Sequence, residues 1–188
     1  MSASEFYALW LLRSHSIDER VKEEFSLLNV RQLNWKSNDK SWSIGQCLDH
    51  LIVSNQRYFP ILDRLVNKNH RMSFWERYNP LAKYTGKKMV ESLGPKVIKP
   101  FQAPKLFAPS PKPIRASIVN DFLLHQDQLR KKVKSVEHID PEKIFVSSPA
   151  AELITYSLKD CLLILNGHEE RHIHQAQKIM QSNSFAAI

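Results

Sequence analysis

The placement of the prolines constrains this chain more than any other feature of its sequence. Seven of the ten prolines lie between positions 80 and 113, and the chain contains only four glycines. Proline lacks a backbone N–H and disfavours helix interiors, so the stretches on either side of residues 80–113 are free to form long helices. Helical periodicity is therefore expected in the flanking stretches.

Four stretches outside this region space their apolar residues three and four positions apart, as amphipathic helices do. Ser43 and Gln46 form a capping box at the start of the second stretch, and Ser157 is a candidate cap for the fourth. Pro60 is expected to kink or break the second helix about one turn earlier. The four predicted helices cover residues 4–29, 43–65, 114–137 and 158–180.

Four long helices predict an all-α protein, specifically a four-helix bundle. The strand-like run at residues 144–147 has no hairpin turn signal to pair it with a second strand. The connection over residues 71–113 is too long for an ordinary loop, so a short helix near residues 74–78 and then an extended proline-rich cover are expected. Crossovers of this length occur in bundles whose second and third helices run parallel. A single domain over residues 1–188 is expected.

Composition excludes several classes of protein. With 43% hydrophobic and 24% charged residues, neither intrinsic disorder nor a coiled-coil rod fits. No window approaches the roughly 18 uninterrupted apolar residues of a membrane helix, and the N-terminus lacks the pattern of a signal peptide. A cytoplasmic protein is expected, with no membrane partner.

The net charge of +8 is concentrated in one segment. Residues 83–115 contain eight basic residues and one acid, which is +7 of the total. This excess raises the prospect of an anionic partner for the segment. Phe101 and Phe107 lie among these lysines, but such interleaving is only a weak signal of nucleic-acid binding, so we do not expect nucleic acid as a partner.

Histidines provide the strongest chemical signal. His168 and His172 are four residues apart, so on a helix their imidazoles lie one turn apart on one face and can reach one metal ion. A solvated surface pair is the alternative. His50 flanks the apolar face of the second predicted helix and could point across the bundle toward them, or it could be a core histidine bonded to a neighbour.

These residues also carry a family resemblance. The chain is similar to the DinB/YfiT-like superfamily of metalloproteins over residues 9–181. The similarity rests on Trp42-Ser43 leading into the helix of His50-Leu51, on His168 and His172 with Gln175 three residues on, and on the segment FQAPKLFAPSP at residues 101–111.

The resemblance implies an up-down-down-up four-helix bundle with a three-histidine site for a divalent metal, zinc or nickel. Its ligands would be His50, His168 and His172. Three imidazoles leave a coordination position open on a tetrahedral metal, as in catalytic sites. The resemblance further implies a thiol-dependent S-transferase or a hydrolase acting on a small molecule, with a low-molecular-weight thiol as one partner, and it allows a homodimer.

A second interpretation stays open, in which the protein is a non-enzymatic metal-binding or stress-response module that uses the basic segment 83–115. The sequence itself assigns no general acid or base.

Other polar residues are further candidates for a site. Gln175 is well placed to bond a metal-binding imidazole, whereas Glu169 and Asp49 point about 100° away from the neighbouring histidine and are expected to be solvated. His125 is expected to be a core or boundary histidine with its hydrogen bonds satisfied. Two groups of residues are assigned no chemistry: Cys47 and Cys161, as buried hydrophobes, and His15, His70 and His138, as surface residues.

Overall fold

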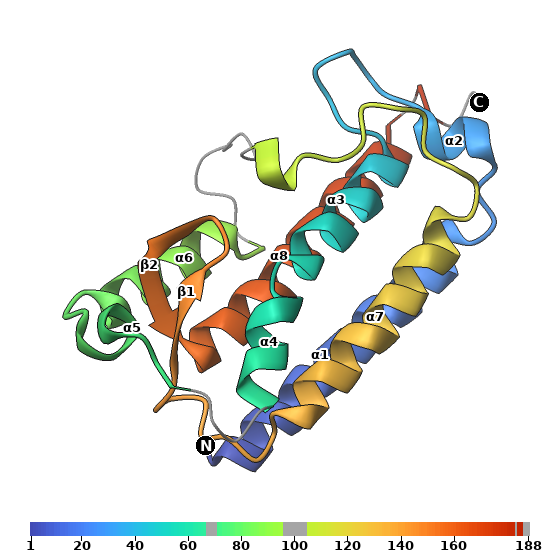
Figure 1. The fold of residues 1–188 in the computed structure, drawn as a ribbon. Coiled ribbons are helices and arrows are strands. Elements are labelled where there is room, and N and C mark those ends of the chain that lie inside the picture. Colours follow the sequence, from blue (N-terminus) through green and yellow to red (C-terminus); the bar gives the residue numbers. More distant parts are fainter. Residues whose placement is uncertain (67–70, 96–104, 183, 186–188) are drawn as a thin grey trace.

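The computed structural model describes residues 1–66, 71–95, 105–182 and 184–185, which are mostly helical and include a small two-stranded sheet (Figure 1). Its elements, in chain order, are α1 (Ala3–Phe25), α2 (Val30–Asn34), α3 (Ile44–Gln56), α4 (Phe59–Val66), α5 (Phe74–Tyr78), α6 (Ala82–Leu93), the short 3₁₀ turn η1 (Lys105–Phe107), α7 (Ile118–Ser135), β1 (Phe145–Ser148), β2 (Ala151–Ser157) and α8 (Leu158–Met180).

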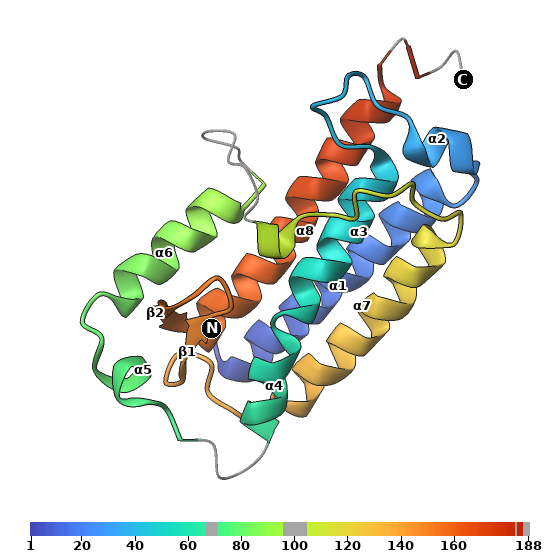
Figure 2. The same ribbon diagram turned by 45° about the horizontal axis from the view of Figure 1, so that its top comes forward.

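The long helices α1, α3, α7 and α8 pack side by side around a common core. Helices α1 and α3 each contact both α7 and α8, which closes a ring of four packed pairs. In both views α1 and α8 run toward the end of the molecule where α2 lies, whereas α3 and α7 run away from it (Figures 1 and 2). Helix α6 and strand β2 cover α8 on its outer side.

The predicted caps set the starts of the two helices that matter most for the site. Ser43 Oγ accepts a hydrogen bond from the backbone N–H of Gln46, and the Gln46 side chain accepts one from the N–H of Ser43. Ser157 Oγ accepts from the N–H of Asp160 at the start of α8. Both caps satisfy backbone donors that the first helical turn leaves without partners. They therefore fix where α3 and α8 begin.

The break predicted at Pro60 is also confirmed. Helix α3 ends at Gln56, and α4 begins at Phe59, three residues further on. Pro60 lies in the first turn of α4, where its missing N–H removes no helical hydrogen bond.

The all-α prediction is wrong at one place, residues 145–157. Strand β1 pairs antiparallel with β2, with Phe145 opposite Ser157 and Ser148 opposite Ala151. Pro149 and Ala150 join the strands, so the turn contains none of the glycine or asparagine residues by which short hairpins are recognised in a sequence. The hairpin was missed for that reason.

Other element boundaries also differ from the prediction. The short helix expected near residues 74–78 is present as α5, but α6 then takes the place of the first part of the expected extended cover. Helix α7 begins at Ile118, because the backbone of Ile114 is bonded through both its N–H and its C=O to the side chain of Asn34. The first predicted helix, residues 4–29, ends earlier, at Phe25, and the short helix α2, which was not predicted, follows with its own cap at Asn29.

A buried polar layer divides the hydrophobic core in two. One apolar cluster includes Trp10, Leu129 and Leu165, and the other includes Val21, Leu51, Phe122 and Ile173. Between them, each of the four long helices contributes buried polar side chains that bond to one another. We call this set the polar layer: Ser14, Asp18, Asn55, Gln126, Arg130 and Glu169.

Among the described residues, no helix combines the length and the apolar character that a membrane crossing requires.

We predict that Gly86→Ala destabilises the fold. A Cβ atom at this position would collide with Oδ2 of Asp160, which accepts a hydrogen bond from Ser157, and would lie 3.0 Å from the Cβ of Tyr156. Either the Asp160 side chain would have to give up that bond or α6 would have to shift. The free energy of unfolding should fall by about 1–3 kcal/mol in denaturant titration. The neighbouring exposed substitution Lys87→Ala is the control and should change it by less than about 0.5 kcal/mol. An unchanged Gly86→Ala protein would contradict the packing described.

Candidate metal centre

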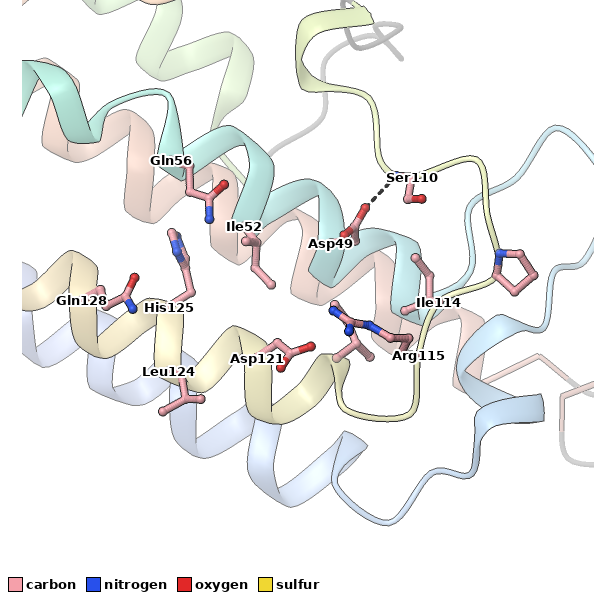
Figure 3. Close-up of a pocket in the computed structure, with 12 residues that line it drawn as sticks. Asp49, Ile52, Gln56, Ser110, Ile114, Arg115, Asp121, Leu124, His125 and Gln128 are labelled. Atoms are coloured by element: carbon pink, nitrogen blue, oxygen red, sulfur yellow. Dashed lines mark hydrogen bonds between the residues drawn. The ribbon is translucent and has the colours of Figure 1, made fainter.

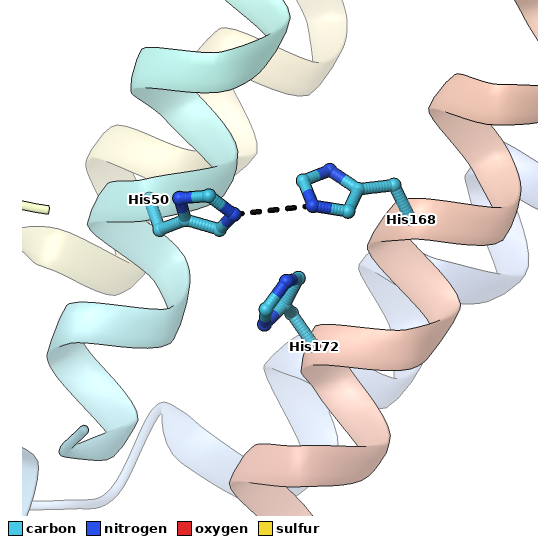
Figure 4. Close-up of side chains that lie close together, drawn as sticks. All are labelled: His50, His168 and His172. Carbon is cyan, nitrogen blue, oxygen red and sulfur yellow. Dashed lines mark hydrogen bonds between the residues drawn. The ribbon is translucent and has the colours of Figure 1, made fainter. Parts of the chain in front are cut away.

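Three histidines from two helices meet between α3 and α8 (Figure 4). His50 lies on α3, and His168 and His172 lie one turn apart on α8. One ring nitrogen from each histidine lies within 4.8 Å of the other two, and the Nε2 atoms of His50 and His168 are 3.1 Å apart. The structure thus brings together all three residues that the sequence singled out.

Two of the imidazoles are oriented by bonds to their other nitrogen. His50 Nδ1 donates to the backbone carbonyl of Phe107 at 2.5 Å, and His172 Nδ1 donates to Oε1 of Gln175 at 3.0 Å. With the proton on Nδ1 in each neutral ring, Nε2 carries the lone pair. This is the arrangement in which histidine ligands are held when their outer nitrogen bonds a carbonyl group.

Burial keeps the three imidazoles neutral. Desolvation lowers the pKa of His172 to about 3, lowers that of His168 well below its usual value, and lowers that of His50 to a smaller extent. The proximity of the other histidines lowers the pKa of His168 and His172 further, as does the positive charge of Arg171. Neutral imidazole is the form that binds metals, so the cluster is ready for this role at neutral pH.

Trp42 forms one wall of the cluster. Its ring stacks on His172 with the centroids 5.5 Å apart and the planes at 25°, and it lies tilted against His50 at 4.7 Å. The residue stands directly before the Ser43 cap, which explains how it reaches the cluster. The Trp42-Ser43 pair is the feature of the sequence that places this ring beside the histidines.

A strap that begins with η1 and continues as irregular chain crosses α3 next to the site (Figure 2). This strap, residues 105–113, holds three successive contacts to α3. The carbonyl of Phe107 accepts a hydrogen bond from His50. The N–H of Ser110 donates to Asp49 at 2.6 Å, and the carbonyl of Ser110 accepts from the Gln46 side chain at 3.3 Å. Sequence reasoning noted the segment but missed that its backbone orients a histidine. Part of the basic segment, residues 96–104, lies outside the described residues.

The expectations for the surrounding polar residues are met in part. Gln175 bonds His172 as expected, and Asp49 is half-buried beneath the strap. The expectation that Glu169 is solvated is wrong. Its side chain is fully buried in the polar layer, where Oε1 accepts hydrogen bonds of 2.6 Å from Asn55 and Gln126. Glu169 lies about 100° around α8 from His168, and this direction leads into the core and not toward water. Desolvation there raises the pKa of Glu169 to about 7.

The remaining candidates lie away from the cluster. His125 is buried between α7 and the α3–α4 region, but neither of its ring nitrogens has a partner among the described residues, so the expectation of satisfied hydrogen bonds is wrong. His15 and His138 are exposed, as predicted, whereas His70 lies outside the described residues. Both cysteines are fully buried, as predicted.

The donor set fits a divalent metal ion. Two nitrogens bound tetrahedrally at about 2.0–2.1 Å from zinc are roughly 3.3 Å apart, close to the 3.1 Å between His50 and His168. Imidazole nitrogen suits zinc, nickel, copper and iron alike, so the donors do not select one ion. The three-histidine group could therefore hold a metal ion.

Comparison with known proteins gives the family of this chain. The model of the DinB superfamily matches residues 17–176, which include α3, α7 and all three histidines. The chain therefore belongs to the DinB superfamily. The comparison with curated proteins gave no match, and neither did the comparison with solved structures.

We predict that His125 makes the protein less stable in acid. Burial lowers its pKa from 6.5 to about 4, so the unfolded chain binds a proton below pH 6.5 that the folded chain does not bind until about pH 4. The free energy of unfolding is therefore unaffected above about pH 6.5, and it decreases as the pH falls from 6.5 to about 4. In His125→Phe the loss of unfolding free energy between pH 7 and 4.5 should be smaller by about 2–3 kcal/mol. Identical pH dependence in both proteins, measured by urea unfolding, would contradict this.

Proposed function

We propose that this protein is a metal-dependent enzyme whose His50, His168 and His172 hold one zinc or nickel ion. The observation that carries the proposal is the convergence of three neutral imidazole nitrogens within 4.8 Å of one another. Three protein ligands are typical of catalytic metal sites, because they leave a coordination position for water or substrate. When bound, the ion supplies Lewis acidity, which lowers the pKa of a water or a thiol at that position.

The residues around the histidines have separate tasks in this proposal. Gln175 and the Phe107 carbonyl hold two of the rings with their Nε2 atoms toward the centre. Trp42 covers His50 and His172 and keeps water from that side. The charge of Arg171 lowers the pKa of the neighbouring histidines. The Arg171 side chain also donates a hydrogen bond to the backbone carbonyl of Ser92, near the end of α6. A fixed positive charge beside the site favours an anionic substrate.

We propose a thiol-dependent S-transferase or a hydrolase as the reaction class, with a low-molecular-weight thiol as the co-substrate of the transferase. The protein's own cysteines do not suit the role of nucleophile. Both are fully buried, and desolvation raises the pKa of Cys47 to about 12 and that of Cys161 higher still. A thiolate nucleophile would therefore come from a small molecule that enters from solvent.

We further propose that the four long helices form an up-down-down-up bundle. The parallel course of α3 and α7, opposite to α1 and α8, supports this connectivity. The long connection between α4 and α7 supports it as well, because parallel neighbours need a crossover.

We predict that the protein purified from cells supplied with zinc and nickel carries about one divalent ion per chain, and that His168→Ala loses it. His174→Ala is the matched control, because this histidine lies on the same helix but is exposed and outside the cluster. Elemental analysis by mass spectrometry gives the stoichiometry. Wild-type protein without metal, or His168→Ala protein that keeps it, would refute the metal site.

The same proteins test the reaction class. Metal-loaded wild type should consume a small thiol in the presence of an alkylating electrophile or should hydrolyse an activated ester, and His168→Ala should do neither. Wild type that binds metal but catalyses neither reaction would favour the non-enzymatic interpretation.

We predict that Gln175→Leu weakens metal binding about 10- to 100-fold, because His172 loses the acceptor that fixes its ring. Competition with a chromophoric zinc chelator measures the affinity. Gln177→Leu serves as the control, since the Gln177 side chain bonds Glu24 on α1. Equal affinities in the two variants would show that Gln175 does not position the ligand.

A further inference from the structure

The strap is bonded to α3 at Ser110 through both of that residue's backbone groups. The Ser110 N–H donates to Oδ2 of Asp49 at 2.6 Å, as the dashed line in Figure 3 shows. The Ser110 carbonyl accepts from Nε2 of Gln46 at 3.3 Å. A hydrogen bond with a charged acceptor is about twice as strong as one between neutral groups. Asp49 therefore supplies the stronger part of this attachment.

The carbonyl that orients His50 lies a short way along the chain from the attachment. Ala108 and Pro109 alone separate Phe107 from Ser110. Consecutive Cα atoms are about 3.8 Å apart, and the ring of Pro109 fixes its own φ angle, so the link has little freedom. The position of Ser110 on α3 therefore determines where the Phe107 carbonyl lies, 2.5 Å from Nδ1 of His50.

This carbonyl selects one tautomer of His50. A carbonyl oxygen only accepts hydrogen bonds, so it requires the proton on Nδ1 and leaves the lone pair on Nε2, the nitrogen that faces His168. Among the described residues, the other group within reach of Nδ1 is the hydroxyl of Ser54, at 3.4 Å. A hydroxyl both donates and accepts, so Ser54 by itself selects neither tautomer. Without the carbonyl, some molecules would carry the proton on Nε2, where it blocks a metal.

We infer that Asp49 is a positioning residue for the candidate metal centre and acts on His50 through the strap. Its side chain lies about 100° around α3 from that of His50, so it reaches the ring only by way of Ser110 and the Phe107 carbonyl. The inference rests on the proposed metal site and adds a regulation of it.

The regulation is a coupling between ion binding and docking of the strap. A metal on Nε2 of His50 favours the ring with its proton on Nδ1, which is the ring that bonds the docked strap. Linkage makes the effect reciprocal: the factor by which docking raises the affinity for the ion is also the factor by which the ion stabilises the docked strap.

Two replacements of Asp49 separate its role as an acceptor from its charge. Asp49→Leu removes the acceptor, and its affinity for zinc, measured by competition with a chromophoric chelator, should fall about 10- to 100-fold. Asp49→Asn loses the charge but keeps a carbonyl oxygen for the Ser110 N–H, so it should retain most of the affinity. Asp127→Leu is the control, because it removes an exposed acid on α7 that pairs with Lys131, and it should bind zinc as the wild type does.

Metal-free protein provides a measurement that does not depend on the ion. Nitrogen NMR of the His50 ring should show the proton on Nδ1 in the wild type and in Asp49→Asn. Asp49→Leu should instead show an average of the two tautomers. A purely structural role of Asp49 would leave the tautomer unchanged.

Amide hydrogen exchange tests the coupling itself. In the wild type, zinc should slow exchange of the Ser110 N–H by about tenfold or more. A variant with one glycine inserted between Ala108 and Pro109 leaves Asp49 intact but lengthens the link. Its Ser110 N–H should stay protected in metal-free protein, yet zinc should no longer slow its exchange, and the affinity for zinc should fall as in Asp49→Leu. This variant decides the question even if Asp49→Leu does not fold.

The inference is overturned if folded, metal-free Asp49→Leu keeps the His50 tautomer of the wild type. It is equally overturned if zinc binds the wild type without slowing exchange at Ser110, or if folded Asp49→Leu binds zinc as tightly as the wild type. A wild-type protein that binds no zinc would refute the proposed metal site instead, and the tautomer of metal-free Asp49→Leu would still decide whether Asp49 positions His50.

Discussion

The hydrogen bonds of the polar layer hold the rest of the structure in register. Arg130 pairs with Asp18 at 2.7 Å and bonds Ser14, and Gln126 connects Ser14 to Glu169. Apolar side chains tolerate sliding by a helical turn far better than these groups do, because a buried polar atom that loses its partner costs about 1–3 kcal/mol. Each of the four long helices contributes to the layer. A shift of any one of them would therefore break several bonds at once.

This register decides where the histidines point. Glu169 follows His168 directly, so fixing Glu169 toward α7 and α3 also fixes the direction of the neighbouring imidazole. With α8 held in this rotation, His168 and His172 face α3, which carries His50 in its second turn after the Ser43 cap. The candidate metal centre and the polar layer are thus two adjoining parts of one polar section through the core. The two apolar clusters on either side supply most of the buried hydrophobic surface.

The sequence predicted those features that depend on residues close together in the chain. Ser43 and Ser157 cap their helices through side-chain oxygens that reach only to the next turn, and Pro60 acts on its own helix. The spacing of His168 and His172 is likewise local. His50 could be placed beside His168 and His172 only through the family resemblance, because the sequence of α3 alone does not determine which helix His50 faces.

The features that the sequence did not reveal depend on distant partners. Glu169 was expected in water because a charge is usually solvated, and only Asn55 and Gln126, far away in the chain, make its burial tolerable. The β1–β2 hairpin turns at Pro149-Ala150 without the usual turn residues. Helix α6 is short, and Gly86 permits its close approach to α8 and β2, a contact that no periodicity within residues 82–93 could indicate.

The bond between the strap and His50 has a particular genetic consequence. The acceptor is the main-chain oxygen of Phe107, which every amino acid possesses. Replacing the side chain at that position leaves the acceptor in the molecule, so a scan of single substitutions would pass over one of the two groups that orient the cluster. Insertions and deletions in residues 105–113 are the changes that would move it. The length of this segment therefore matters more than its amino-acid sequence for keeping the Phe107 carbonyl on His50.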